Sequence, residues 1–136
     1  MEKMIVDKLM ELVDTAIDAD EVPIAAVIVK DNNIIAVAHN RTEKLGSVLG
    51  HAEIQAIELA SKELNTWHLD GCELYVTLEP CDMCWGAIRN ARIKTVFYLA
   101  KSHKSITFKT NSKQIANSQL ETQYVEKLQS FFEKKR

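Results

Sequence analysis

The sequence predicts an α/β protein, a three-layer α/β/α sandwich around a central mixed sheet of about five strands. Three observations predict this class. Runs rich in β-branched residues alternate along the chain with stretches of helical periodicity. Residues 72–100 have the pattern of a strand, a helix and a strand, and such a unit joins parallel neighbours. Helical stretches also stand at both ends of the chain, so helices are available for both faces of the sheet.

The first part of the chain supplies a helix and two strands. Ile5, Leu9 and Val13 recur at helical spacing, and Pro23 then opens a β-branched run. Turn residues at 31–33 separate that run from a second one. The elements predicted here are a helix over 2–18, a strand over 24–30, a strand over 34–40 and a loop over 41–50.

From His51 a helical pattern resumes, with Ile54, Ile57, Ala60 and Leu64 on one face. The elements predicted after it are a strand over 72–78, a helix over 81–90, a strand over 94–100, a short fifth strand within 105–110 and a long helix over 118–135. Without linkers, repeats or low-complexity stretches, the 136 residues are expected to form a single domain, 1–136.

Composition is that of an ordinary soluble globular protein, with 46% hydrophobic and 26% charged residues. No apolar run reaches the length of a membrane span, and the N-terminal stretch is too acidic for a signal peptide. Three cysteines without secretory features favour a reducing compartment. We therefore expect a cytoplasmic protein with no membrane partner.

Charge is divided unevenly along the chain. Residues 1–84 hold 6 Lys or Arg and 16 Asp or Glu, a net charge of −10, whereas residues 85–136 hold 11 and 3, a net charge of +8. A basic half indicates a polyanionic partner, because clustered cations gain from releasing phosphate counterions. Mutual neutralisation of the two halves within one fold explains the same division equally well.

A cysteine pair follows the third predicted strand, where Pro80 precedes Cys81 and Cys84. Such a pair fits a redox dithiol, half of a structural zinc site, or two ligands of a catalytic metal. The positive end of a helix lowers thiolate pKa values, which suits metal ligation. His51 also opens a helix after a strand, so it and the cysteines should face the same edge of the sheet.

A structural zinc site would need a fourth protein ligand. Cys72 begins the third strand, and at about 3.3 Å per residue it lies roughly 20 Å from Cys81, with His68 farther back. Three protein ligands with water in the fourth position are the catalytic pattern. We therefore expect one Zn²⁺ per chain, held by His51, Cys81 and Cys84.

Glu53 stands two residues after His51, where a carboxylate can take a proton from water and return it to a leaving group. Alone, it would be an ordinary acidic residue in the first turn of a helix. His-Ala-Glu placed 30 residues before Pro-Cys-x-x-Cys is far more specific.

This combination resembles the signature of zinc-dependent cytidine and nucleobase deaminases. Further stretches are similar to bacterial tRNA adenosine deaminases: EVPIAAVIV (21–29), AHNRTE (38–43), WHLDGCELYVTLEPC (67–81) and SFFEKKR (130–136). The resemblance covers about residues 5–100 and the last helix, and it implies a cytidine deaminase-like homodimer that converts the wobble adenosine of a tRNA anticodon to inosine.

Carried over residue by residue, the resemblance makes His51, Cys81 and Cys84 the zinc ligands and Glu53 the proton shuttle. It makes Asn40 a contact to the flipped base. It also assigns the grip on the anticodon loop to the end of the chain: Phe131, Phe132, Lys134, Lys135 and Arg136.

The chain departs from the family pattern at four places. Ala25 stands where the family usually has a glycine. Residues 47–50 are Ser-Val-Leu-Gly instead of Asp-Pro-Thr-Ala, and Trp85 stands where a small residue is usual. A shorter segment without glycine, AKSHKSITFKTN (100–111), replaces a glycine-rich acidic one.

Two other functions remain as alternatives. A free-base or nucleoside deaminase acting on guanine or cytosine would use the same metal-binding residues. A non-catalytic zinc or dithiol protein would show a fourth protein ligand or a redox-active cysteine pair. The basic second half favours RNA, and Phe132, outside the apolar stripe that Phe131 continues, is expected near the surface to stack on a base.

Overall fold

The computed structural model describes residues 1–135. The elements follow in the order α1 (Glu2–Asp18), β1 (Ala25–Lys30), β2 (Asn33–His39), α2 (Thr42–Leu45), the short 3-10 helix η1 (Val48–Gly50), α3 (Ala52–Leu64), β3 (Cys72–Leu78), α4 (Asp82–Asn90), β4 (Thr95–Ala100), β5 (Ser112–Gln114) and α5 (Ser118–Lys134). Among these described residues, no helix combines the length and apolarity that crossing a membrane requires.

The five strands form one mixed sheet in the order β2-β1-β3-β4-β5. β1 runs antiparallel to β2 and β3, whereas β3, β4 and β5 are parallel to one another. A two-residue turn, Asp31 and Asn32, joins β1 to β2, and both residues have positive φ (50° and 63°), as hairpin turns of this length require. The predicted mixed sheet and its parallel strand–helix–strand unit are confirmed.

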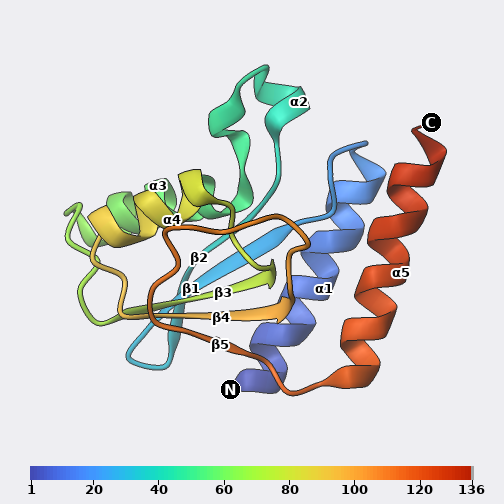
Figure 1. Ribbon diagram of the computed structural model, residues 1–136. Coiled ribbons are helices and arrows are strands. Elements are labelled where there is room, and N and C mark those ends of the chain that lie inside the picture. Colours follow the sequence, from blue (N-terminus) through green and yellow to red (C-terminus); the bar gives the residue numbers. More distant parts are fainter. Residues whose placement is uncertain (136) are drawn as a thin grey trace.

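Helices cover both faces of this sheet, which confirms the predicted three-layer sandwich. Figure 1 shows α3 and α4 together on one side, with α1 and α5 on the other. Each side has its own apolar core: alanines of α3 with Trp85 and Ile88 of α4 on one face, and Ile5, Leu9 and Tyr124 on the other. Every residue of the interior strand β1 except its last is buried, because both faces of that strand are covered.

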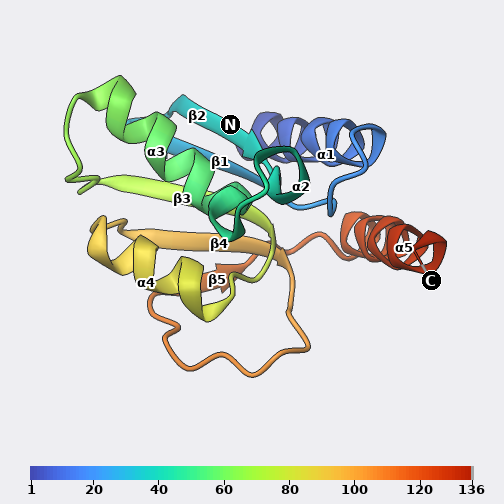
Figure 2. The same cartoon turned by 90° about the horizontal axis from the view of Figure 1, so that it is seen from above.

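α5 is held in place by one buried and two exposed contacts. The Tyr124 hydroxyl donates to the backbone oxygen of Pro23 at 2.8 Å, and Tyr124 is fully buried. Lys127 forms an ion pair of 2.6 Å with Asp14 of α1, and Lys135 forms one of 2.6 Å with Asp20, two residues after α1. The buried bond fixes the middle of α5, and its last turns consequently extend past the carboxyl ends of the strands (Figure 2).

The buried face of α3 differs from the predicted one. Ala52, Ala56 and Ala60 are fully buried, whereas Ile54 is only half-buried, and Ile57 packs at the edge of the core. Alanines spaced four residues apart let the helix lie close to the sheet, and bulkier isoleucines would hold it away. The predicted face was therefore correct at Ala60, Ile57 and Leu64, which all contact the core, and wrong at Ile54.

Residues 41–50 were predicted as a plain loop, but they contain α2 and η1. The carboxylate of Glu21, which is buried, accepts hydrogen bonds from the backbone N–H groups of Glu43 (3.0 Å) and Lys44 (2.8 Å). Glu21 therefore satisfies the free donors at the start of α2 from 22 residues away. No sequence pattern within residues 41–50 predicts this contact with Glu21.

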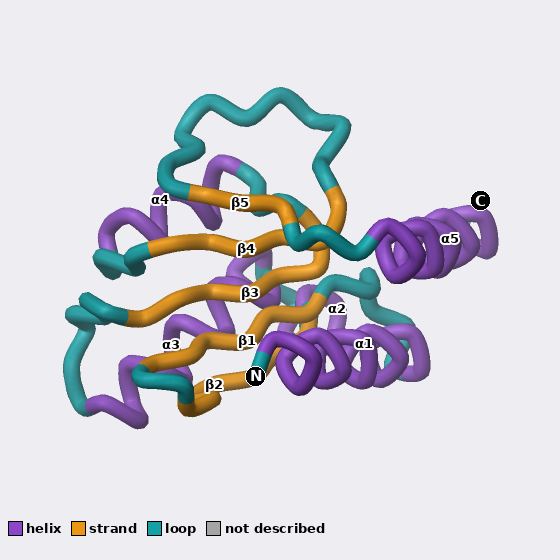
Figure 3. The backbone as a smooth tube through the Cα atoms, turned by 90° about the horizontal axis from the view of Figure 1, so that it is seen from below, coloured by secondary structure: helices purple, strands orange, loops and turns teal. Residues whose placement is uncertain are grey.

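The predicted fifth strand at 105–110 was wrong. β5 instead lies at Ser112–Gln114, where it pairs with β4 through Val96 and Ser112. The backbone N–H groups of Thr107 and Phe108 bond to the Asp82 carboxylate, so they are unavailable to a sheet. Figure 3 shows the segment between β4 and β5 looping out beyond the edge of the sheet.

Candidate active site

One imidazole and two thiols meet at the N-termini of α3 and α4. His51 is the N-cap residue of α3, Cys81 is the N-cap residue of α4, and Cys84 lies one turn into α4. His51 Nδ1 is 3.7 Å from Cys81 Sγ and 3.5 Å from Cys84 Sγ, and the three ligand atoms lie within 4.8 Å of one another. Tetrahedral zinc with bonds of about 2.1–2.3 Å separates its ligand atoms by about 3.5–3.8 Å. The spacing therefore fits a metal ion, and two sulfurs with an imidazole are donors that suit zinc.

The thiols of Cys81 and Cys84 have pKa values shifted in opposite directions. The pKa of Cys81 is lowered to about 5, chiefly because its sulfur accepts a hydrogen bond from Cys84. The pKa of Cys84 is raised, because its proton is held by Cys81 and because the side chain is buried. One thiolate thus exists near neutral pH before any metal binds, and a divalent cation would displace the remaining proton.

Cys72 takes no part in this cluster. It is fully buried at the start of β3 and belongs to the apolar core, as expected for a lone cysteine there. Within residues 1–135, the group able to hold a metal consists of His51, Cys81 and Cys84. A fourth protein ligand is therefore absent from the described part of the chain, which is the arrangement of an open site.

Glu53 stands beside the cluster in the first turn of α3. The residue is 4% exposed, and burial raises the pKa of its carboxyl group from 4.5 to about 7, with the nearby Cys81 thiolate adding to the increase. His51 precedes the helical residues with extended backbone angles (φ −61°, ψ 142°), and His51 and Glu53 line the same cavity. A carboxyl group with a pKa near 7 can accept and donate a proton at neutral pH.

A cavity of about 330 Å³ opens over these groups. His51, Glu53 and Cys81 are among its lining residues. The rest of the lining is mostly apolar: Val22, Ile24, Asn40, Thr42, Ala52, Leu78, Glu79, Lys104, Leu128 and Phe132. A larger groove of about 530 Å³ runs between α1 and α5, but it contains none of the clustered groups. The smaller cavity, which holds the clustered groups, is therefore the candidate active site.

Asn40 lies in this cavity, where the resemblance had put a base contact. It is 5% exposed, and its Oδ1 accepts a hydrogen bond from the backbone N–H of Thr42 at 3.0 Å. That bond fixes the orientation of the amide. The side-chain NH₂ group is then the donor that Asn40 can offer to a molecule in the cavity.

The end of the chain is divided between two places. Phe132 is 44% exposed and lines the cavity, as expected, whereas Phe131 is buried with its ring edge-on to that of Phe132 (5.5 Å, 79°). Lys134 and Lys135 line the groove between α1 and α5 instead. Arg136 lies outside the described residues. The structure thus brings Phe132 to the active site, but it does not bring Lys134 or Lys135 there.

Sequence reasoning missed several residues around the cavity. Glu79 and Lys104 line it, and the only advance signal for Lys104 was its position in the basic half of the chain. Trp85, noted as a departure from the family pattern, is fully buried in the core, and its indole N–H has no hydrogen-bond partner among the described residues.

Comparison with known proteins finds a deaminase family and curated deaminases that are similar to this chain. The MafB19-like deaminase family matches residues 2–136. The chain is 49% identical over 89 residues to the tRNA-specific adenosine deaminase of Aquifex aeolicus, a match that covers 65% of this chain and 59% of that protein. It is also 49% identical over 79 residues to the guanine deaminase of Bacillus subtilis, covering 58% of this chain and 51% of that protein. The chain therefore spans little more than half the length of these curated relatives.

A solved structure from a study of A-to-I editing by tRNA:A34 deaminases at the wobble position of transfer RNA superposes with a TM-score of 0.84. The two sequences are 34% identical, and the match covers 93% of this chain and 99% of that chain. This match confirms the expected cytidine deaminase-like sandwich. Because the family match runs from residue 2 to residue 136, the chain belongs to the MafB19-like deaminase family.

Proposed function

We propose that the chain is a hydrolytic, zinc-dependent deaminase that converts adenosine to inosine at the wobble position of a tRNA anticodon. The observation that carries the proposal is the buried Glu53 carboxyl group beside the His51, Cys81 and Cys84 cluster, in a cavity large enough for a base. The relatives named as tRNA-specific adenosine deaminases support the choice of substrate. In this proposal residues 1–136 are one deaminase domain.

One Zn²⁺ would be held by His51, Cys81 and Cys84, and when bound it supplies the Lewis acidity that makes water a nucleophile near neutral pH. Glu53 takes the proton that this water loses and delivers it to the ring nitrogen next to C6 of adenine. Glu53 then assists the departure of the amino group as ammonia, so water and adenosine give inosine and ammonia. Burial favours this role, because a carboxyl pKa of about 7 allows Glu53 to gain and lose the proton easily.

Asn40 and Phe132 would hold the flipped base. The Asn40 amide is fixed by its bond to Thr42, and the partly exposed ring of Phe132 can stack on a base at the edge of the cavity. Lys134, Lys135 and Arg136 would contact phosphates of the anticodon loop. Phe131 supports the ring of Phe132 from the core, and we assign it no direct contact.

A free-base deaminase is the second candidate. The guanine deaminase of Bacillus subtilis is 49% identical to this chain over 79 residues, and the tRNA-specific adenosine deaminase of Aquifex aeolicus is 49% identical over 89 residues. The same zinc ligands and the same Glu53 would serve guanine. The basic C-terminal end favours RNA, because a free base has no phosphate for it to bind.

Incubation of the purified protein with unmodified tRNA transcripts, free guanine and free cytosine tests the proposal. We expect inosine in a tRNA and no turnover of either base, while Glu53→Ala should bind zinc and lose nearly all activity. Conversion of guanine to xanthine without inosine in any tRNA would establish the second candidate instead. A Glu53→Ala protein that keeps most of the wild-type rate would remove Glu53 from the mechanism.

We also propose a homodimer in the cytoplasm. Leu45, Val48 and Leu49 are exposed together on the segment that projects above the sheet in Figure 1, with Val48 at 72%, and such an apolar patch suits a second copy. Free thiols at the site suit a reducing compartment. Val48→Asp should shift the protein to monomer in sedimentation experiments, whereas the matched change at exposed Leu59 should not. Equal masses for wild type and Val48→Asp would contradict this surface.

A further inference from the structure

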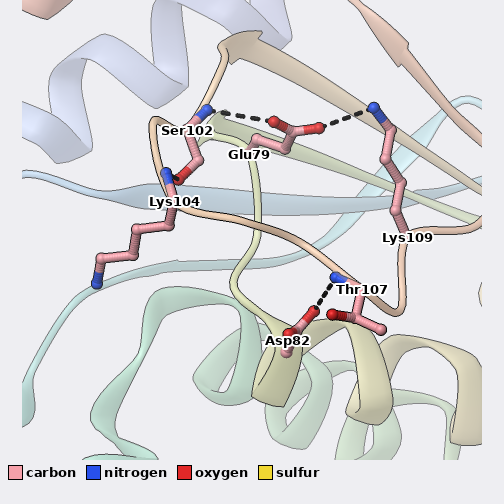
Figure 4. A network of polar contacts seen from close by, with 6 residues as sticks. All are labelled: Glu79, Asp82, Ser102, Lys104, Thr107 and Lys109. Atoms are coloured by element: carbon pink, nitrogen blue, oxygen red, sulfur yellow. Dashed lines mark hydrogen bonds and ion pairs between the residues drawn. The ribbon is translucent and has the colours of Figure 1, made fainter.

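The segment 101–111, where the chain departs from its family pattern, is tied to the cysteine motif by two carboxylates. Glu79 and Asp82 stand on either side of Pro80 and Cys81, and Figure 4 shows both of them bonded to this segment. The position of the segment is therefore coupled to the stretch that carries Cys81.

Glu79 holds both ends of the segment. Its carboxylate is buried, accepts a hydrogen bond from the backbone N–H of Ser102 at 3.2 Å, and forms a 3.0 Å ion pair with Lys109. Because one carboxylate binds residues seven positions apart in the chain, the segment between them is closed into a loop. A buried carboxylate that forms an ion pair and accepts a hydrogen bond stabilises the position of the segment, although the Lys109 side chain itself is exposed.

Asp82 forms hydrogen bonds with the middle of this loop, and Ser102 forms one with Lys104. The Asp82 carboxylate accepts hydrogen bonds from the backbone N–H groups of Thr107 (2.8 Å) and Phe108 (3.1 Å). The Ser102 hydroxyl accepts one from the backbone N–H of Lys104 at 3.1 Å. Lys104 thus has a fixed backbone on an exposed segment, and its side chain extends away from the Glu79–Lys109 pair (Figure 4).

Lys104 brings a positive charge to the cavity. It is the one Lys or Arg among the described residues that line the cavity. Lys109, Lys127 and Lys135 each have a carboxylate partner, whereas Lys104 forms no ion pair with the described residues. An unpaired ammonium group on a fixed backbone at a substrate cavity is suited to bind an anion.

We propose that Lys104 is a specificity-determining residue that binds a phosphate next to the nucleotide whose base enters the cavity. The loop formed by residues 101–111 positions this cation, and its contact distinguishes a base within RNA from a free base, which carries no phosphate. The proposal rests on the proposed function and adds to it a phosphate contact at the active site itself, separate from the C-terminal residues.

The test uses a short RNA hairpin with one adenosine in its loop, and variants in which each phosphate flanking that adenosine is replaced in turn by a neutral methylphosphonate. Deamination rates are measured for wild type, Lys104→Met, Lys104→Arg and the control Lys113→Met, which removes an exposed lysine of β5 outside the cavity. Hairpin binding is measured by fluorescence anisotropy in the Glu53→Ala background, which separates affinity from turnover.

We expect Lys104→Met to raise KM and Kd about tenfold with kcat nearly unchanged, and to reduce the slope of log Kd against log salt by about 0.7. One methylphosphonate should weaken wild type about tenfold and leave Lys104→Met unaffected, because the pair of changes removes the same contact. Lys104→Arg should restore most of the affinity, and Lys113→Met should behave as wild type.

Suppose that wild type edits the hairpin but Lys104→Met has the same Kd and salt slope as wild type. This result would leave the proposed function standing but overturn the role of Lys104. Additive losses from Lys104→Met and from both methylphosphonates would also overturn it, because the contact would then lie elsewhere. Wild type that neither binds nor edits RNA would overturn the proposed function itself, and the phosphate contact with it.

Discussion

Replacing Glu53 by glutamine in the metal-free protein should remove a pH-dependent loss of stability. The pKa of this carboxyl group rises from 4.5 in the unfolded chain to about 7 in the folded one. A group with a raised pKa contributes its stability fully below the unfolded pKa and loses it as pH rises through the folded pKa. Wild type should therefore lose stability between pH 4.5 and about 7, because the unfolded chain ionises Glu53 more readily.

A shift from 4.5 to about 7 corresponds to about 3 kcal/mol of unfolding free energy once both states are ionised. Between pH 5 and pH 8, the stability of Glu53→Gln relative to wild type should thus increase by about 2.5 kcal/mol. Titrating groups that do not couple to Glu53 are common to both proteins and cancel in this difference, whereas Cys81 and Cys84 couple to it.

Urea unfolding followed by circular dichroism, with EDTA present throughout, measures both free energies across this pH range. Glu58→Gln is the matched control, since it removes an exposed carboxylate from the same helix, and its difference from wild type should stay constant. Added Zn²⁺ should flatten the wild-type curve, because a nearby cation favours the carboxylate. A difference between Glu53→Gln and wild type that does not change with pH would refute the burial argument.

Three further predictions concern the metal, the loop before it and the end of the chain. Cys84→Ala should lose zinc in metal analysis of the purified protein, and a fully loaded variant would show that another residue takes its place. Gly50→Ala should lower the free energy of unfolding in urea by about 1–3 kcal/mol, because the added Cβ would lie 2.6 Å from the backbone nitrogen of Thr42. The control Gly86→Ala should not lower it, because a Cβ at Gly86 meets nothing within 4 Å. Equal losses in the two variants would contradict this. Deletion of residues 132–136 should leave zinc content and melting temperature almost unchanged but reduce tRNA deamination about tenfold or more, and full activity after the deletion would make the end a simple terminus.

The sequence by itself determined the elements and the chemistry that depend on local spacing. Periodicity placed α1, β3 and α5 within a residue of their observed bounds, and the parallel unit of β3, α4 and β4 was predictable from the pattern of strand, helix and strand. The cluster of His51, Cys81 and Cys84, which could hold a metal ion, was predictable for the same reason. Cys81 and Cys84 lie three residues apart at a helix start, and His51 opens a helix directed at the same edge of the sheet, so each position follows from a nearby strand end.

The contacts around the cavity were decided only by the tertiary structure. Glu21 reaches α2 across 22 residues, Glu79 reaches Ser102 across 23, and Asp82 reaches Thr107 across 25. Each contact joins a carboxylate to backbone N–H groups in an aperiodic segment, where hydrophobic periodicity carries no information about partners. The Phe132 ring and His51 line the same cavity, and their separation along the chain does not predict this. Packing of α5 against the sheet, fixed by the buried Tyr124 hydroxyl, brings that ring to the active site and leaves Lys134 and Lys135 outside it.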